Sequence, residues 1–178
     1  MRTKWMKCII AVAILLIVAV CILPRKMHID TTIDAVEWVL NKEDSTKKVS
    51  VKVKGTYNTY LFKKNSFDGE IQIDGYSQTD NATLQTVYFT DGVGNLIYQD
   101  KQDSLKMTSV GFLVCSSDFK EVLIGVYSDS GLWTGDDGIV ISGSASDYVG
   151  ALQTAKKLSE SSEWLSRNNP FDDEKKEN

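Results

Sequence analysis

The chain has 178 residues, of which 42% are hydrophobic and 25% are charged, and its formal net charge is −4. The first 28 residues carry five basic residues and no acid, whereas the rest carry 15 basic and 24 acidic residues, a net charge of −9. A strongly acidic domain lacks the basic face that nucleic-acid binding requires. The composition therefore excludes a nucleic-acid partner, and the length after the first 28 residues suits one hydrophobic core.

Residues Cys8–Leu23 form a run of 16 residues whose only polar side chains are two thiols. A helix that spans a bilayer needs about 17–25 apolar residues, and Trp5 and Met6 can extend the run. The flank before the run holds three basic residues and the flank after it, up to residue 28, holds two, which favours a cytoplasmic N-terminus. The sequence therefore predicts an N-terminal transmembrane helix that contacts the lipid bilayer through Cys8–Leu23 and carries the C-terminal domain outside the cell membrane.

Two other fates of this segment stay open. A cleaved signal peptide would leave the domain secreted, but such peptides have a small-residue cleavage site, and the sequence Ala19-Val20-Cys21 ends on Cys. Lipoprotein processing would leave the domain lipid-anchored at Cys21, although Val20 stands where such motifs carry Gly, Ala or Ser. We rank the uncleaved anchor first.

The rest of the chain is rich in short apolar segments with β-forming residues. Val49, Val51 and Val53 alternate with polar residues, which is the period of a half-buried strand. Asp91-Gly92 between two such segments predicts a hairpin turn. The expected fold class is mainly β, an antiparallel meander that forms a sandwich or a partial barrel, with two flanking helices.

The first helix is expected over residues 31–40, where Thr31 and Asp34 resemble a capping box and apolar residues recur at helical spacing. Residues 41–48 are polar and indicate a break between elements. The second helix is expected to begin near Ser144, with Asp147 completing a capping box. Its apolar face would hold four residues: Ala145, Val149, Leu152 and Ala155.

The chain is therefore expected to consist of three parts. The anchor and its flanks occupy residues 1–28, and one β-rich domain with its two helices occupies 29–167. The charged residues 168–178 are expected to form a disordered tail.

Part of the predicted sheet resembles the sequences of a known group of proteins. The segments Tyr60–Lys64, Phe67–Gly69 and Ile71–Tyr76 resemble small membrane-anchored, uncharacterised exported proteins of Gram-positive bacteria. The resemblance covers the middle third of the chain. It implies a place in the bacterial cell envelope and implies no activity or site residue.

An acid-rich segment, residues 129–138, is the main candidate for a local binding site. Its carboxylates Asp129, Asp136 and Asp137 are candidate ligands for Ca²⁺, which prefers several oxygen donors. Their spacing does not match an EF-hand loop. We prefer the alternative that the Asp and Gly residues supply turn geometry between strands, and we therefore expect no metal ion or other cofactor.

Four lysines in the first strands, Lys52, Lys54, Lys63 and Lys64, are candidates for contact with an anionic surface. If a hairpin brings them together, they form a basic stripe that could face lipid headgroups or an anionic envelope polymer. The preferred alternative is the solvated face of an edge strand, on which lysine also prevents aggregation.

No residue pattern in the sequence predicts catalysis. The only histidine, His28, is expected in a linker between the membrane and the first helix, outside any folded site. Cys115 has no basic neighbour nearby in the sequence and is expected to be buried. The aromatic residues between 57 and 133 belong either to the core or to the lining of a pocket.

These observations favour a membrane-anchored extracytoplasmic binding module of unknown ligand that is not an enzyme. The alternative is a non-catalytic accessory or interaction subunit of a membrane or cell-envelope complex. The partner would then be an envelope polymer or a membrane protein.

Overall fold

The computed structural model describes residues 23–128, 130–135, 137–167 and 169–171, together with Trp5 and Ile10. Most of the predicted membrane span Cys8–Leu23 and the predicted tail lie outside the described residues. Among the helices that are described, none combines the length and the apolar character that a membrane crossing requires. The expectation of a mainly antiparallel β domain is confirmed.

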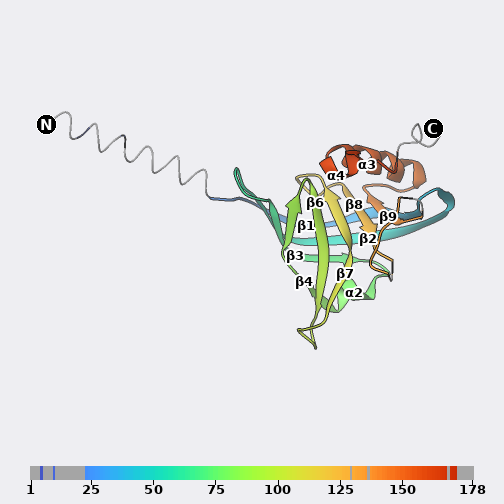
Figure 1. Cartoon of the computed structure of the whole chain (residues 1–178), viewed down its shortest axis with the longest axis horizontal. Coiled ribbons are helices and arrows are strands. Elements are labelled where there is room, and N and C mark those ends of the chain that lie inside the picture. The colour runs from blue at the N-terminus through green and yellow to red at the C-terminus, as the bar shows by residue number, and fades with distance from the viewer. Residues whose placement is uncertain are drawn as a thin grey trace.

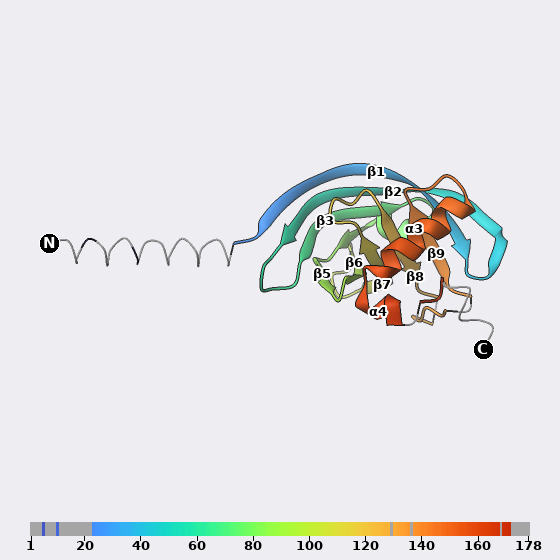
Figure 2. The same ribbon diagram turned by 90° about the horizontal axis from the view of Figure 1, so that it is seen from above.

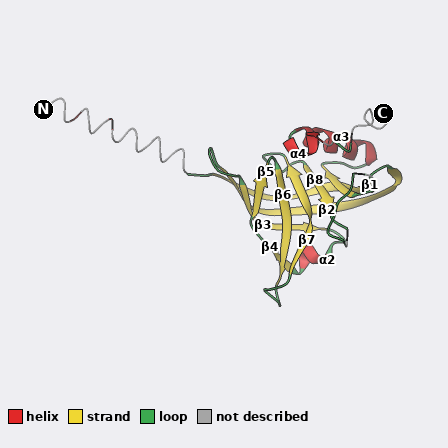
Figure 3. Cartoon of the chain, in the orientation of Figure 1, coloured by secondary structure: helices red, strands yellow, loops and turns green. Residues whose placement is uncertain are grey.

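Strands make up most of the described chain (Figures 1 and 3). They are β1 (Arg25–Val39), β2 (Lys42–Thr59), β3 (Ser66–Ile73), β4 (Ala82–Leu84), β5 (Val87–Thr90), β6 (Val93–Asp100), β7 (Met107–Cys115), β8 (Val122–Val126) and β9 (Ile139–Gly143). The helices are α2 (Ser77–Asp80), α3 (Tyr148–Glu160) and α4 (Glu163–Arg167).

The sheet is an antiparallel meander that closes on itself. Most strands pair with the next strand in the chain; the exception is β4, since β3 pairs with β5, and β4 and β5 both pair with β6. The sheet closes where the last strand, β9, pairs with the first, β1. The result is a barrel in which the long β1–β2 hairpin curves around one side (Figure 2).

The barrel interior is filled by side chains. Alternate residues of each strand point inward, because successive side chains of a strand face opposite sides of the sheet. Buried interior residues include Val51, Phe67, Ile71, Ile73, Leu96, Tyr98, Leu113, Val122, Ile124 and Ile141. The two aromatic residues in this list, Phe67 and Tyr98, are core residues.

The turn between β7 and β8 closes one end of this interior. Phe119, in the middle of the turn, is 0% exposed. Its ring centroid lies 5.0 Å from that of Phe67 and 5.4 Å from that of Tyr57. The backbone φ of Phe119 is +54°, an uncommon conformation for a bulky residue, so the packing of its ring holds the turn in this form.

A second hydrophobic core lies outside the barrel wall, under the C-terminal helices. The buried face of α3 includes Ala151, Ala155 and Leu158, which pack with Trp38 of β1 and with other wall residues. The hydroxyl of Ser142 in β9 donates a hydrogen bond of 2.8 Å to the carbonyl of Ala151. The outer wall is therefore covered by helix on the side of β1, β9, β8 and β7 (Figure 2).

The prediction of a helix over residues 31–40 is wrong, because most of this segment forms the second half of β1. Ile33 and Ala35 face the barrel interior, whereas Val36 and Trp38 face outward under α3. Burial on both faces produces a nearly continuous apolar run, whose spacing imitates a helical stripe. The expected polar break at 41–48 is also wrong: Asn41 forms a tight turn at φ +62° and β2 begins at Lys42.

The second predicted helix exists with different limits. Asp147 is its N-cap residue, and its carboxylate accepts a hydrogen bond of 2.9 Å from the backbone N–H of Gly150. Ser144 lies before the helix, in the connection from β9. Val149 is exposed rather than part of the buried face. The hairpin turn expected at Asp91-Gly92 is confirmed, with both residues at positive φ as a type I′ turn requires.

Two glycines allow β2 and β3 to approach closely. Gly55 pairs with Gly69 in the register of these strands. A Cβ atom on Gly55 would lie 2.4 Å from the carbonyl oxygen of Asp68, and one on Gly69 would lie 2.3 Å from that of Lys54. The curvature of the barrel at this point therefore depends on glycine at both positions.

We expect Phe119→Ala to lower the free energy of unfolding by about 3–5 kcal/mol, because it removes a fully buried ring from the interior. Urea unfolding followed by circular dichroism measures this loss. Phe62→Ala is the matched control, since Phe62 is 79% exposed, and its effect should stay within about 0.5 kcal/mol. Equal effects of the two variants would contradict the packing of Phe119 described above.

Candidate binding groove

A groove of about 710 Å³ lies on the outside of the barrel, between β1, the β7–β8 turn and α3. Nine of its ten lining residues are polar or charged, so it suits a hydrophilic ligand rather than a lipid. The lining residues are Thr31, Thr32, Ile33, Asp34, Ser116, Asp118, Lys120, Glu121, Ser144 and Lys157. We call this feature the groove.

One wall of the groove is strand β1. β1 pairs with β2 along nearly its whole length, but it pairs with β9 only from Ala35 to Val39. From Arg25 to Ile33, no strand of the described chain pairs with the other side of β1. This side of β1 over Arg25–Ile33 is called the β1 edge.

The backbone groups that point to the β1 edge can be assigned. In an antiparallel strand, the N–H and C=O of one residue point to the same side, and successive residues alternate. The carbonyl of Asp34 accepts a hydrogen bond of 3.0 Å from the N–H of Ala145, next to β9. Asp34 therefore faces the β9 side, and so do Thr32 and Asp30. The groove thus contains the backbone N–H and C=O of Thr32.

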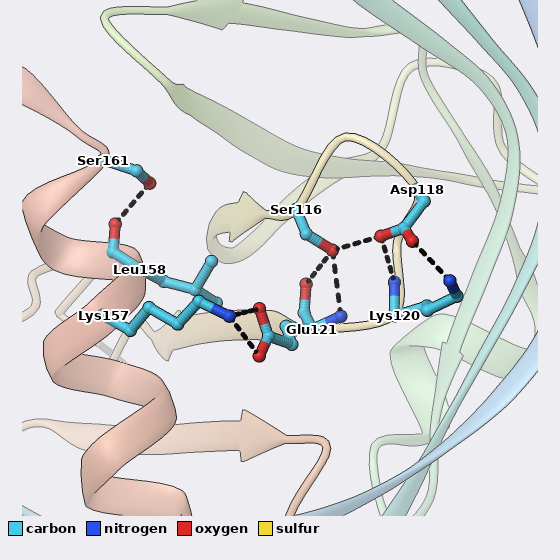
Figure 4. A network of polar contacts seen from close by, with 7 residues as sticks. All are labelled: Ser116, Asp118, Lys120, Glu121, Lys157, Leu158 and Ser161. Atoms are coloured by element: carbon cyan, nitrogen blue, oxygen red, sulfur yellow. Dashed lines mark hydrogen bonds and ion pairs between the residues drawn. The ribbon is translucent and has the colours of Figure 1, made fainter.

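The opposite wall is the β7–β8 turn, which a network of polar contacts holds in shape (Figure 4). The Ser116 hydroxyl donates a hydrogen bond of 2.8 Å to the carboxylate of Asp118. The Lys120 ammonium lies 2.8 Å from the other oxygen of that carboxylate. The N–H of Glu121 donates to the Ser116 hydroxyl oxygen at 3.0 Å. The burial of Phe119 and this network together fix the side chains that face the groove.

The turn is also tied to helix α3. The Lys157 ammonium lies 2.7 Å from both carboxylate oxygens of Glu121 (Figure 4). Surface ion pairs contribute only about 0–1 kcal/mol to stability. The contact therefore serves mainly to set the position of α3 relative to the turn.

Hydrogen bonds from the Lys120 ammonium and from the Ser116 hydroxyl lower the pKa of Asp118 well below its ordinary value. The same contact with Asp118 raises the pKa of Lys120. Both groups therefore stay charged over the whole physiological pH range.

The charges that line the groove do not balance. Asp34, Asp118 and Glu121 face the groove with two lysines, which leaves one negative charge. Lys120 and Lys157 are each paired within the protein, whereas Asp34 forms no ion pair with any described residue. The groove therefore favours a ligand with a positive charge near Asp34.

The four candidate lysines do not form one basic stripe. Lys52 and Lys54 lie on the outer face of β2, and Lys54 stands in register between Asp30 of β1 and Glu70 of β3. Its ammonium lies 4.0 Å from the carboxylate of Asp30. Lys63 and Lys64 lie elsewhere, in the loop between β2 and β3. Acidic residues therefore flank Lys54, whereas Lys52 stands between Thr32 and Gln72, and no acid occurs within the loop that holds Lys63 and Lys64.

The structure describes only one of the three candidate Ca²⁺ ligands. Asp137 accepts a hydrogen bond from the hydroxyl of Thr134, and Asp129 and Asp136 lie outside the described residues. Among the residues that are described, no three His, Cys, Asp or Glu side chains gather in a way that could hold a metal ion.

His28 lies within β1 rather than in a linker, opposite Thr56 of β2, and its Nδ1 atom is 3.1 Å from the Thr56 hydroxyl oxygen. It points to the exposed face and is separate from the groove. Cys115 is partly buried against the barrel interior, and burial raises the pKa of its thiol. Among the described residues, no hydrogen bond or ion pair joins His28 or Cys115 to the partners that a nucleophilic site would need.

Sequence reasoning did not find the groove residues. They come from four separate segments, which only the closure of the barrel brings together. One signal was present: Ser116 and Asp118 are spaced as residues whose side chains bond to nearby backbone in tight turns. Comparison with family models, with curated proteins and with solved structures found no match to this chain.

We expect the carboxyl group of Asp118 to titrate below the ordinary range of about 3.9, and Lys120→Met to raise its midpoint. Because the pKa is lowered in the folded state, the contribution of Asp118 to stability is present above its unfolded pKa. It is lost as the pH falls through the folded pKa. Carbon-detected NMR of the side-chain carboxyl measures the midpoint; an unchanged midpoint in Lys120→Met would contradict the Lys120–Asp118 contact.

Proposed function

We propose that this chain is a membrane-anchored extracytoplasmic binding module that captures an extended polypeptide segment in the groove. The unpaired β1 edge is the single observation that carries this proposal. A peptide that lies along Asp30–Thr32 could form main-chain hydrogen bonds with backbone groups that have no strand partner. The β7–β8 turn and α3 would then contact its side chains.

The ligand class follows from the surroundings of the β1 edge. Main-chain pairing requires an extended chain that offers N–H and C=O groups on one side, which a polypeptide does at a repeat matched to the strand. The negative charge left at Asp34 favours a lysine or arginine in the bound segment. The polar lining disfavours an apolar ligand.

The filled interior supports binding on the outside. Barrels of about eight strands either fill their interior with side chains or enclose one small ligand. Here Phe119 closes one end, and the interior residues are almost wholly buried by one another. A ligand inside the barrel would have to displace this core.

An accessory or interaction subunit is the second candidate, and an apolar recess favours it. Phe112, Val93 and Trp164 line a recess of about 240 Å³ beside α4. Trp164 is 49% exposed, although its ring lies 5.5 Å from that of Phe112. Partly exposed aromatic residues of this kind are frequent in protein interfaces. In this case the captured peptide would belong to a membrane-protein partner that also covers Trp164.

Thr32→Pro tests the proposal, because proline removes the backbone N–H that points to the groove. The native sheet loses no hydrogen bond, so the free energy of unfolding should change little. Random linear peptides displayed on phage are selected against the full chain in lipid-bilayer discs, and binding of the enriched peptides is measured by fluorescence anisotropy. We expect enrichment of basic, extended sequences and binding at least about tenfold weaker to Thr32→Pro.

Two variants serve as controls. Thr32→Val keeps the N–H and should keep the affinity, whereas Thr31→Pro removes a hydrogen bond to β2 and should destabilise the barrel. Peptides that bind Thr32→Pro as tightly as the native chain would contradict binding at the β1 edge. The absence of any enriched peptide would contradict the whole proposal.

A further inference from the structure

The loop between β2 and β3, Tyr60–Asn65, presents apolar side chains to solvent. Leu61 is 67% exposed and Phe62 is 79% exposed. Lys63 and Lys64 follow them directly, and both are exposed. Single exposed apolar residues are ordinary on protein surfaces. Two adjacent ones followed by two lysines form the combination that peripheral membrane segments use at the boundary between headgroups and acyl chains.

The base of this loop is held in place. The N–H of Tyr60 donates to the side-chain oxygen of Asn65 at 3.0 Å, and the side-chain nitrogen of Asn65 donates to the Tyr57 hydroxyl at 3.2 Å. The carbonyl of Asn65 accepts a hydrogen bond of 2.9 Å from the N–H of Phe89. The apolar side chains are therefore presented by a fixed turn, which reduces the entropy lost on binding.

The loop lies at the end of the barrel where the apolar run of the sequence stops. The pairing of β1 with β2 ends at Arg25 and Thr59. Leu23, the last residue of the apolar run, and Leu61 each stand two residues beyond this pair. Figures 1 and 2 both show the end of the β2–β3 hairpin beside the start of β1.

The two segments that meet at this end are basic, although the domain as a whole is acidic. Arg25 and Lys26 at the start of β1 join Lys63 and Lys64, and no acid occurs in residues 23–29 or 59–67. The nearest acid across the hairpin, Asp68, accepts hydrogen bonds from Asn58 and Thr86. Four basic residues therefore occur in the two segments that meet at this end, where Leu61 and Phe62 are exposed.

We propose that the Tyr60–Asn65 loop binds the surface of an anionic lipid bilayer. Leu61 and Phe62 lie at the boundary between headgroups and acyl chains, and Lys63 and Lys64 contact anionic headgroups. The apolar run and the loop together give two attachments, which hold the barrel in one orientation on the membrane. This inference rests on the membrane anchorage in the proposed function, but it is independent of the groove.

Hydrogen exchange tests this proposal on the full chain in lipid-bilayer discs. The discs contain either zwitterionic lipid alone or zwitterionic lipid with phosphatidylglycerol, and detergent micelles give the reference. Amide exchange in residues 60–65 is followed by mass spectrometry. We expect exchange at least about tenfold slower in the anionic discs than in micelles, and a smaller effect in zwitterionic discs.

The turn between β6 and β7 is the internal control. It carries Leu105, which is 92% exposed, next to Lys106, and it lies apart from the start of β1 (Figure 1). Its exchange should be the same in discs and micelles. The paired variants Leu61→Ser/Phe62→Ser and Lys63→Glu/Lys64→Glu change only exposed residues, so both should fold, and both should restore fast exchange in residues 60–65.

Two results would overturn the proposal. One is equal exchange of residues 60–65 in anionic discs and in micelles. The other is protection that survives Leu61→Ser/Phe62→Ser, since the loop would then be shielded by nearness to the bilayer without inserting. Variants in the groove such as Thr32→Pro should leave this exchange unchanged, so failure of the groove and failure of the loop are distinguishable.

Discussion

The unequal pairing of β1 with its two neighbours is the constraint on which the rest of the structure depends. β1 pairs with β2 along nearly its whole length but with β9 over only five residues, from Ala35 to Val39. The five pairs close the barrel and let α3 cover the outer wall. The unpaired remainder of β1 leaves backbone groups that face the groove. One strand thus provides both the closure of the fold and the unpaired edge on which the proposed peptide binding rests.

Packing explains why the surfaces proposed for binding lie outside the filled interior of the barrel. Phe119 fills one end of the interior, and its neighbours Asp118 and Lys120 must then lie on the outer side of the turn. The ion pair of Glu121 with Lys157 fixes α3 against the same turn. The β7–β8 turn therefore supplies both a core residue, Phe119, and one wall of the groove. A substitution at Phe119 would alter the groove as well as the core.

The alternation of polar and apolar residues in β2 and the Asp91-Gly92 turn could be predicted from the sequence, because both are local signals. The second half of β1 could not, since burial on both faces hides the two-residue period. The capping role of Asp147 was visible, but the helix limits were misplaced by the nearby Ser144. The groove could not be predicted, because its residues meet only after β9 has paired with β1. The charge of Lys63 and Lys64 could be read from the sequence, but only the register of β1 with β2, which ends at Arg25 and Thr59, shows that their loop begins at the end of the barrel where β1 starts.

Backbone amide exchange along β1 in the free chain, resolved residue by residue by NMR, tests directly whether the β1 edge is unpaired. We expect the rates to alternate: the amides of Thr31 and Ile33 exchange slowly because they are bonded to β2, and those of Asp30 and Thr32 exchange fast because they face the groove. Equally slow exchange at all four residues would show that the β1 edge is already covered, and would rule out a free edge for peptide binding.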